Sequence, residues 1–223
     1  MRTLFAILWL LYTCNNAYTQ GKGGIEQYTY LGTGERPQVA PVIHYQDNNK
    51  WYAEARYNYE DRRTFSLYAG KTFSSEKKVA WALTPMIGGM TGKQQGGLLG
   101  LNTTISYKKT YFSSQSQYGV SQQGREENFF FSWSEAGYQL LPWMCTGISL
   151  QHTKLYNCRA VVEPGLFAGF SFKQWTFPVY SFNPFGAERY FVLGINREWK
   201  FGKSKRHRAP AFSQAATSPI VDP

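Results

Sequence analysis

The sequence has little of what most metal sites and enzyme active sites need. It contains three cysteines and three histidines in 223 residues, and no CxxC or HxxxH spacing accompanies them. The Gly-rich run 88–97 lacks the GxxxxGK[ST] order of a phosphate loop. Ser149 precedes His152 by three residues, but a hydroxyl near an imidazole in one hairpin is a weak sign of a nucleophile and base. We therefore expect no metal, no cofactor, no catalytic residues and no enzyme activity.

Long apolar runs are also missing. The run 4–12 follows Arg2 and precedes small or polar residues, which predicts a signal peptide over residues 1–19. A buried N-terminal element is the alternative, and lipoprotein processing at Cys14 fits the bulky residues before it poorly. No other run approaches the roughly 20 residues of a helical membrane span. A membrane protein with this sequence is therefore a closed barrel.

What the sequence has in quantity is glycine and aromatic residues: 21 Gly, 7 Trp, 16 Tyr and 16 Phe, a composition that favours strands and tight turns. The stretch WYAEARYNYE, residues 51–60, alternates between two faces. One face carries Trp51, Ala53, Ala55, Tyr57 and Tyr59, and the other carries Tyr52, Glu54, Arg56, Asn58 and Glu60. Similar segments recur as far as Phe201.

The recurring segments predict an all-β fold: an antiparallel up-and-down transmembrane β-barrel of about 12 strands, with a range of 8 to 12, over residues 20–201. The weakest is Gln27–Gly32, included because closure with both ends on one side needs an even number. The predicted strands are 27–32, 39–45, 51–59, 64–73, 79–88, 98–107, 110–119, 129–138, 143–151, 165–172, 175–182 and 191–201.

The direction of the last strand assigns the ends of the barrel. Its aromatic C-terminus is typical of outer-membrane barrels and puts Phe201 on the periplasmic side of a bacterial outer membrane. The same side then collects a basic rim, made of Lys77, Lys78, Lys108, Lys109 and Lys173. The tail 202–223 is basic, then rich in Pro, Ser and Ala, which predicts disorder. We expect outer-membrane lipid around the barrel, envelope protein partners at the rim and tail, and no nucleic acid, although the formal charge is +10.

Alternation also predicts the lumen. Its lining is expected to include Glu54, Arg56, Asn58, Asn102, Thr104, Ser132 and Ser134. Bulky residues on the same face, able to block a small lumen, are Tyr52, Tyr68, Met86, Tyr118 and Tyr180. Phe129, Phe131 and Trp133 are then expected to face lipid. Glu135 lies on the same face of the strand as these three residues. Because a lipid-facing charge is costly, we expect Glu135 near the periplasmic end or pointing inward.

Cys145 and Cys158 flank a predicted hairpin whose tip lies near Gln151 and His152. A disulfide between them is geometrically feasible if the register is symmetric about that tip. Two free thiols in neighbouring strands are the alternative.

Several phrases add a resemblance. They are RYNYE at 56–60, TPMIGG at 84–89, SYKK at 106–109, FSWSE at 131–135, GFSFK at 169–173 and FNP at 182–184. They resemble a family of small outer-membrane β-barrel proteins of Bacteroidetes type, whose function is largely unassigned. The resemblance implies the barrel fold and transfers no catalytic or ligand residue.

Three functions fit this architecture. The first is a porin-type barrel for small polar or anionic solutes, as in the small twelve-stranded porins for acidic sugars, with which the similarity is architectural; its cationic rim favours anions. The second is a non-conducting barrel that anchors or docks partners in an outer-membrane complex. The third, a soluble barrel with an apolar interior, fits the aromatic residues at both strand ends less well.

Overall fold

The computed structural model describes residues 21–32, 37–156 and 158–201. The signal peptide predicted at 1–19 and the tail 202–223 lie outside the described residues. The strands are β1 (Gly21–Gly32), β2 (Gln38–Asp47), β3 (Trp51–Tyr57), β4 (Thr64–Lys71), β5 (Phe73–Glu76), β6 (Ala80–Gly92), β7 (Gly96–Tyr107), β8 (Thr110–Ser121), β9 (Phe129–Leu141), β10 (Met144–Leu155), β11 (Val161–Phe172), β12 (Trp175–Phe182) and β13 (Tyr190–Phe201).

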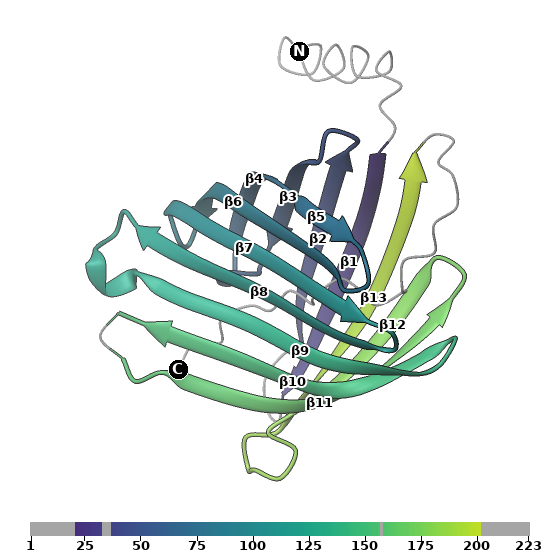
Figure 1. Ribbon diagram of the computed structural model, residues 1–223. Helices are drawn as coiled ribbons and strands as arrows, with labels where there is room; N and C mark the ends of the chain where they lie inside the picture. Colours follow the sequence, from purple (N-terminus) through teal and green to yellow (C-terminus); the bar gives the residue numbers. More distant parts are fainter. Residues whose placement is uncertain (1–20, 33–36, 157, 202–223) are drawn as a thin grey trace, which may run out of the picture.

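These segments form a closed antiparallel barrel of 12 strands, which confirms the predicted fold class (Figure 1). β4 and β5 both pair with β6 and act as one strand interrupted at Thr72. β1 closes the ring against β13, with paired residues running from Gly21 and Phe201 to Gly32 and Tyr190. The first strand, expected to be weak, is therefore as long as its neighbours. Closure pairs the long strands with neighbours on both sides, which is what a strand structure in hydrocarbon requires.

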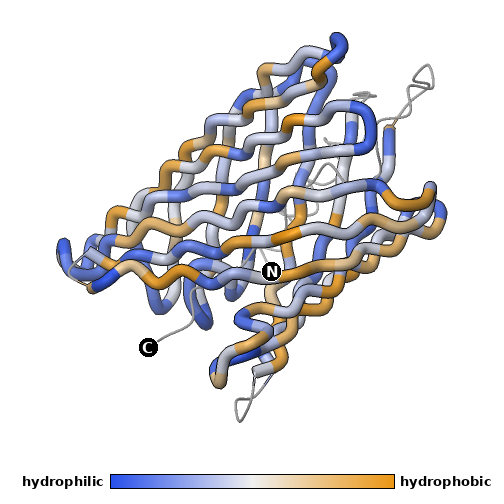
Figure 2. The backbone as a smooth tube through the Cα atoms, turned by 60° about the horizontal axis from the view of Figure 1, so that its bottom comes forward, coloured by the Kyte–Doolittle hydropathy of each residue, from blue (hydrophilic) through white to orange (hydrophobic). Residues whose placement is uncertain are grey.

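The outward face of the barrel carries an apolar belt. Ile87 and Ile148 are 68% and 62% exposed in the middle of their strands. Hydrophobic and hydrophilic residues alternate along many of the strands, and many of the turns are hydrophilic (Figure 2). Further members of the belt are Ile43, Leu67, Leu99, Leu101, Leu166, Val179, Leu193 and Ile195. A belt of this kind faces lipid in outer-membrane barrels, in agreement with the predicted location in a bacterial outer membrane.

The two ends of the barrel differ in their connections. Turns of two or three residues join β2 to β3, β5 to β6, β7 to β8, β9 to β10 and β11 to β12, at the end where β1 begins and β13 ends. Most connections at the other end are longer. The residues Lys77, Lys78, Lys108, Lys109 and Lys173, here called the lysine rim, all lie in the short turns. Outer-membrane barrels have short periplasmic turns and longer outer loops.

Aromatic side chains surround the barrel just above the lysine rim. The exposed rings there are those of Trp51, Phe73, Trp81, Tyr107, Phe112, Tyr138, Trp143, Phe172 and Trp175. Basic groups lie over some of them: the Lys108 ammonium is 5.2 Å from the Tyr107 ring centre, and the Arg197 guanidinium is 5.1 Å from that of Trp175. Such a girdle marks a membrane–water interface.

The structure corrects the prediction for β9. Phe129, Phe131 and Trp133 are at most 2% exposed and point into the barrel, together with Glu135 at 3%. The alternate residues Ser132 and Ser134 therefore lie on the outer face, and the Ser134 hydroxyl is 2.9 Å from that of Ser114 on β8. Alternation alone does not say which face is inside. The inward orientation of Glu135 confirms one of the two placements predicted for it; the other was near the periplasmic end.

The structure agrees with the second of the two alternatives for the cysteines, two free thiols. Cys145 and Cys158 are free; Cys145 is buried inside the barrel and Cys158 is exposed. The reason is that β10 runs to Leu155 and β11 begins at Val161, so Gln151 and His152 lie within a strand rather than at the hairpin tip. Cys145 is then near the short-turn end and Cys158 near the other, about 30 Å apart along the strand at about 3.3 Å per residue.

Candidate functional site

The interior of the barrel is the candidate site, and its two sides differ in chemistry. We call the inward side chains of β9, β11 and β12 the aromatic wall: Phe129, Phe131, Trp133, Phe167, Tyr180 and Phe182. We call the inward polar side chains of β3, β4 and β6 to β8 the polar wall: Glu54, Arg56, Ser66, Tyr68, Thr84, Asn102, Thr104, Ser113, Gln115 and Gln117.

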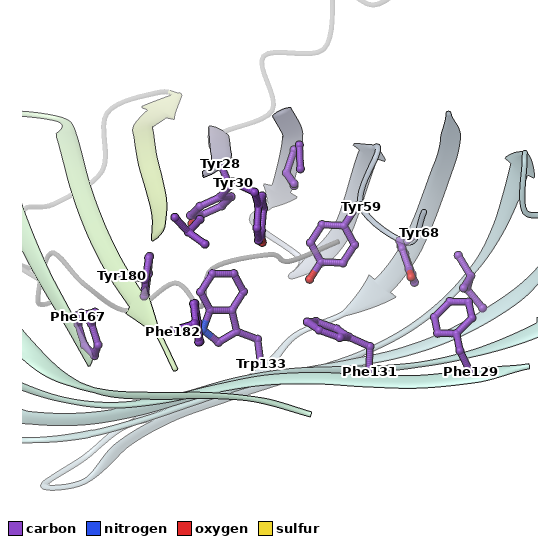
Figure 3. Packing of buried hydrophobic residues seen from close by; sticks show 14 of the residues in the cluster. Tyr28, Tyr30, Tyr59, Tyr68, Phe129, Phe131, Trp133, Phe167, Tyr180 and Phe182 are labelled. Atoms are coloured by element: carbon purple, nitrogen blue, oxygen red, sulfur yellow. The ribbon is translucent and has the colours of Figure 1, made fainter. Parts of the chain in front are cut away.

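Trp133 is the centre of the aromatic wall (Figure 3). Its ring centre lies 4.9 Å from that of Tyr180 and 5.5 Å from that of Phe182, both edge to face. Its indole N–H donates to the Ser149 hydroxyl at 2.6 Å, so the one polar group of the side chain is satisfied. This side of the interior packs like the core of a soluble protein.

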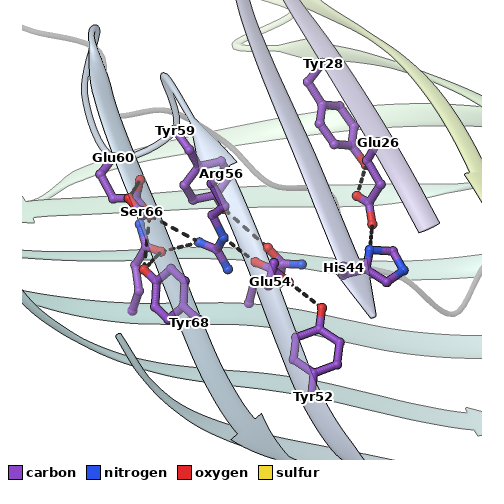
Figure 4. A network of polar contacts seen from close by, with 12 residues as sticks. Glu26, Tyr28, His44, Tyr52, Glu54, Arg56, Tyr59, Glu60, Ser66 and Tyr68 are labelled. Carbon is purple, nitrogen blue, oxygen red and sulfur yellow. Dashed lines mark hydrogen bonds and ion pairs between the residues drawn. The ribbon is translucent and has the colours of Figure 1, made fainter. Parts of the chain in front are cut away.

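Arg56 is the centre of the polar wall (Figure 4). Its guanidinium donates to the Glu54 carboxylate and lies 3.6 Å from that of Glu60. Tyr68 donates to Glu60 at 3.1 Å, and Ser66 also donates to it. The guanidinium stacks over the ring of Tyr68, 4.4 Å from its centre, and over the ring of Tyr59, 4.3 Å from its centre. Burial raises the pKa of the Glu60 carboxyl, and the nearby guanidinium opposes that rise.

A second polar group lies on β1 and β2. The Tyr28 hydroxyl donates to Glu26 at 3.0 Å and accepts from the Asn196 amide at 2.9 Å. The other Glu26 oxygen is 3.4 Å from Nδ1 of His44. Glu26 and His44 are 3% and 5% exposed, so both lie deep in the barrel.

Several side-chain contacts cross the interior between strands that are not neighbours. Arg56 on β3 donates to the Gln117 amide oxygen on β8 at 2.5 Å, although β4, β6 and β7 separate the two strands. Tyr59 reaches Gln115 at 3.3 Å and lies 6.1 Å from the ring of Phe131. On the far side Tyr28 of β1 meets Trp133 of β9, with 5.9 Å between ring centres. Side chains therefore narrow the lumen at mid-depth.

Some buried polar atoms of the polar wall have no protein partner among the described residues. They are Asn102 Oδ1, Ser113 Oγ and Gln117 Nε2. Ser113 is fully buried and Gln117 is 4% exposed. An unsatisfied buried polar group costs about 1 to 3 kcal/mol, so such groups are normally bonded to water or to a ligand. These three atoms lie on the adjacent strands β7 and β8 and mark a polar track along the wall.

The predicted lumen residues divide into three sets. Glu54, Arg56, Asn102 and Thr104 lie on the polar wall. Ser132 and Ser134 lie outside, as described above. Asn58 lies in the turn after β3 with φ 55°, where its amide bonds the Val39 carbonyl and the Arg63 N–H. That turn also swings Tyr59 inward, although alternation predicted it outward.

The predicted blocking residues are mostly inside. Tyr68, Met86 and Tyr180 are at most 3% exposed, and Tyr52 donates to Glu54. Tyr118 is 39% exposed and faces outward. Sequence reasoning missed the aromatic wall and the role of Gln115 and Gln117. The polar character of both faces of β8 was the one signal available for the two glutamines.

The short-turn end of the interior opens into a depression of about 210 Å³. Its lining is polar and mixed in charge, with Lys22, Lys50 and Lys200 near Asp47 and Glu76. Lys50 donates to the Ser74 hydroxyl at 2.5 Å. This depression lies at the end that carries the lysine rim.

The described part of the chain offers neither a metal site of acidic, His or Cys groups nor a helical membrane span. Within residues 21–32, 37–156 and 158–201, no group of three or more His, Cys, Asp or Glu side chains is placed to hold a metal ion. No helix in these same ranges is long and apolar enough to cross a membrane.

Known proteins resemble this barrel in structure but not in sequence. No protein-family model and no curated protein matches the chain. Among solved structures, a KdgM porin superposes with a TM-score of 0.59 at 10% identity, over 78% of this chain and 98% of that one. A KdgM porin in complex with disordered oligogalacturonate gives the same values, and a NanC porin gives a TM-score of 0.53 at 10% identity with the same coverage.

The chain has the porin fold. At this level of identity the similarity establishes the architecture and does not transfer the solutes of those porins. The resemblance to Bacteroidetes-type barrels stays a prediction, because none of these comparisons tests the origin of the chain.

Proposed function

We propose that this protein is a narrow porin-type channel for small polar solutes in the outer membrane. The observation that carries the proposal is the polar track, since Asn102, Ser113 and Gln117 carry buried polar atoms without a protein partner. A dry core would leave these groups unsatisfied, whereas a file of water or solute would satisfy them. The fold shared with KdgM and NanC porins supports the same function.

The track gives the solute a defined route. It follows the polar wall, because the aromatic wall is closely packed and offers few hydrogen-bonding groups. The contact of Arg56 with Gln117 crosses the interior on this route. Passage requires this contact to open, so we expect low flux and a strict size limit. Twelve strands allow a lumen between the filled eight-stranded barrel and the wide channel of 16 to 18 strands.

Swelling of proteoliposomes in solutions of uncharged sugars tests this proposal. The purified protein should admit a small polyol and exclude a trisaccharide. Gln117→Ala removes the side chain that bridges to Arg56 and should increase the swelling rate. Ser134→Ala, on the outer face, is the matched control and should leave it unchanged. Equal impermeability of the wild type and Gln117→Ala would overturn the proposal.

The contacts across the interior favour a second candidate, a non-conducting barrel that anchors or docks envelope partners. In that case the lysine rim and the tail 202–223 form the docking surface. A stoichiometric companion that co-purifies with the full chain and is lost when residues 202–223 are deleted would support this function. Swelling that depends on Gln117 would favour the channel.

A further inference from the structure

The charges inside the barrel are opposite in sign to those on its rim. Among the residues the structure describes, the buried Asp, Glu, Lys and Arg side chains are five acidic and one basic. The acidic ones are Glu26, Glu54, Glu60, Asp61 and Glu135, and the basic one is Arg56. The lysine rim, by contrast, lies in exposed turns.

Arg56 does not balance the carboxylates around it. It bonds Glu54 and lies 3.6 Å from Glu60, so two acidic groups share one guanidinium. Lys93 pairs with Asp61 at 3.1 Å, in the loops at the far end. Glu26 has a tyrosine hydroxyl and a histidine ring as neighbours rather than a lysine or arginine. Glu54 and Glu60 also accept hydrogen bonds from neighbouring hydroxyl groups, those of Tyr52 and Ser66.

A separate observation indicates that something polar occupies this region. The Gln117 side chain is 4% exposed, and its amide oxygen accepts from Arg56 at 2.5 Å. Its amide nitrogen points into the same cluster without a partner among the described residues. The Ser113 hydroxyl also has no partner among the described residues. Ser113 on β8 pairs directly with Glu135 on β9. The acidic groups therefore border the polar track.

From this arrangement we infer that the barrel favours cations over anions, and that Glu26, Glu54, Glu60 and Glu135 set this preference. The inference rests on the proposed channel function. It reverses the anion preference predicted from the lysine rim. Charges at a narrow, low-dielectric constriction act on a permeating ion at close range, whereas exposed rim charges are screened within about 8 Å at physiological salt. The solutes that fit are small cations and polar molecules with a protonated amine.

The reversal potential across planar bilayers under a KCl gradient tests the inference. The wild-type full-length chain should give the sign for potassium over chloride. Glu26→Gln with Glu135→Gln keeps side-chain shape and removes two acidic groups, so the permeability ratio should fall toward one. Glu126→Gln, in an exposed loop, is the matched control and should leave the ratio unchanged.

The outcomes separate the two proposals. Conductance with a preference for chloride, or a potassium preference that the double variant leaves intact, overturns the inference and leaves the channel function standing. Complete absence of conductance overturns the channel function and the inference with it. The wild-type sign needs no variant, so the test holds even if the double variant fails to fold.

Discussion

Replacing Arg56 with alanine tests the polar wall at its centre. Arg56 is 2% exposed and makes a charge-assisted hydrogen bond to Glu54. It also bonds Gln117 at 2.5 Å and lies 3.6 Å from Glu60. Its guanidinium lies over two tyrosine rings, 4.3 and 4.4 Å from their centres. Arg56→Ala therefore removes the one cation that holds two buried carboxylates and bridges the interior.

The expected loss follows from these contacts. Removing one partner of a buried ion pair costs about 3 to 5 kcal/mol, because the remaining charge is left without compensation. Water in the polar track would solvate part of that charge, so we expect about 3 kcal/mol, the lower end of the range. A solvent-exposed pair would cost about 1 kcal/mol or less.

Urea unfolding of the protein in lipid vesicles, followed by tryptophan fluorescence, measures this loss. Arg125→Ala removes an exposed arginine in the loop between β8 and β9 and is the control; it should change stability by less than about 0.5 kcal/mol. A loss below about 1 kcal/mol for Arg56→Ala would refute the description of Arg56 as a buried bridge.

Three other changes test the lipid face, the interior packing and the cysteines. Ile87 is 68% exposed at the centre of the outer face of β6, so Ile87→Arg puts a charge there and should destabilise the barrel in vesicles by about 2 to 4 kcal/mol. A loss under about 1 kcal/mol would argue against lipid contact at this position. Gly119→Ala places a methyl 2.2 Å from the Phe129 ring and should lower the unfolding free energy by about 1 to 3 kcal/mol in the same assay. Gly97→Ala is the control, because its methyl meets nothing within 4 Å. Equal losses for the two variants would contradict close packing of Phe129 against Gly119. A membrane-impermeant maleimide should label Cys158 in the folded protein and Cys145 only after unfolding, and a disulfide-linked peptide in a non-reduced digest would contradict two free thiols.

Much of the fold could be predicted from the sequence because alternation and turn residues are local signals. The twelve predicted segments all correspond to strands, and even parity required the first of them. The even number of strands also predicted that the turns carrying the lysine rim lie together at one end of the barrel. The strand ends were predicted less accurately. β10 extends to Leu155 rather than 151, so Cys158 lies farther from Cys145 than the predicted hairpin implied.

The interior was harder to predict because a period of two does not distinguish inside from outside. Phe131 and Trp133 have the apolar character of a lipid face, yet they point inward. Glu135, on the same side of β9, was the clue, since a carboxylate is costly in hydrocarbon. Contacts such as Arg56 with Gln117 join strands that are not neighbours, and no local pattern predicts them.

Single-channel recording of the purified full-length protein in planar bilayers probes the polar track most directly. If water and solutes follow this wall, the wild type should give small, discrete conductance steps. Gln117→Ala should give larger ones, and Ser134→Ala steps of wild-type size. A silent bilayer with both the wild type and Gln117→Ala would show that the interior is a closed core.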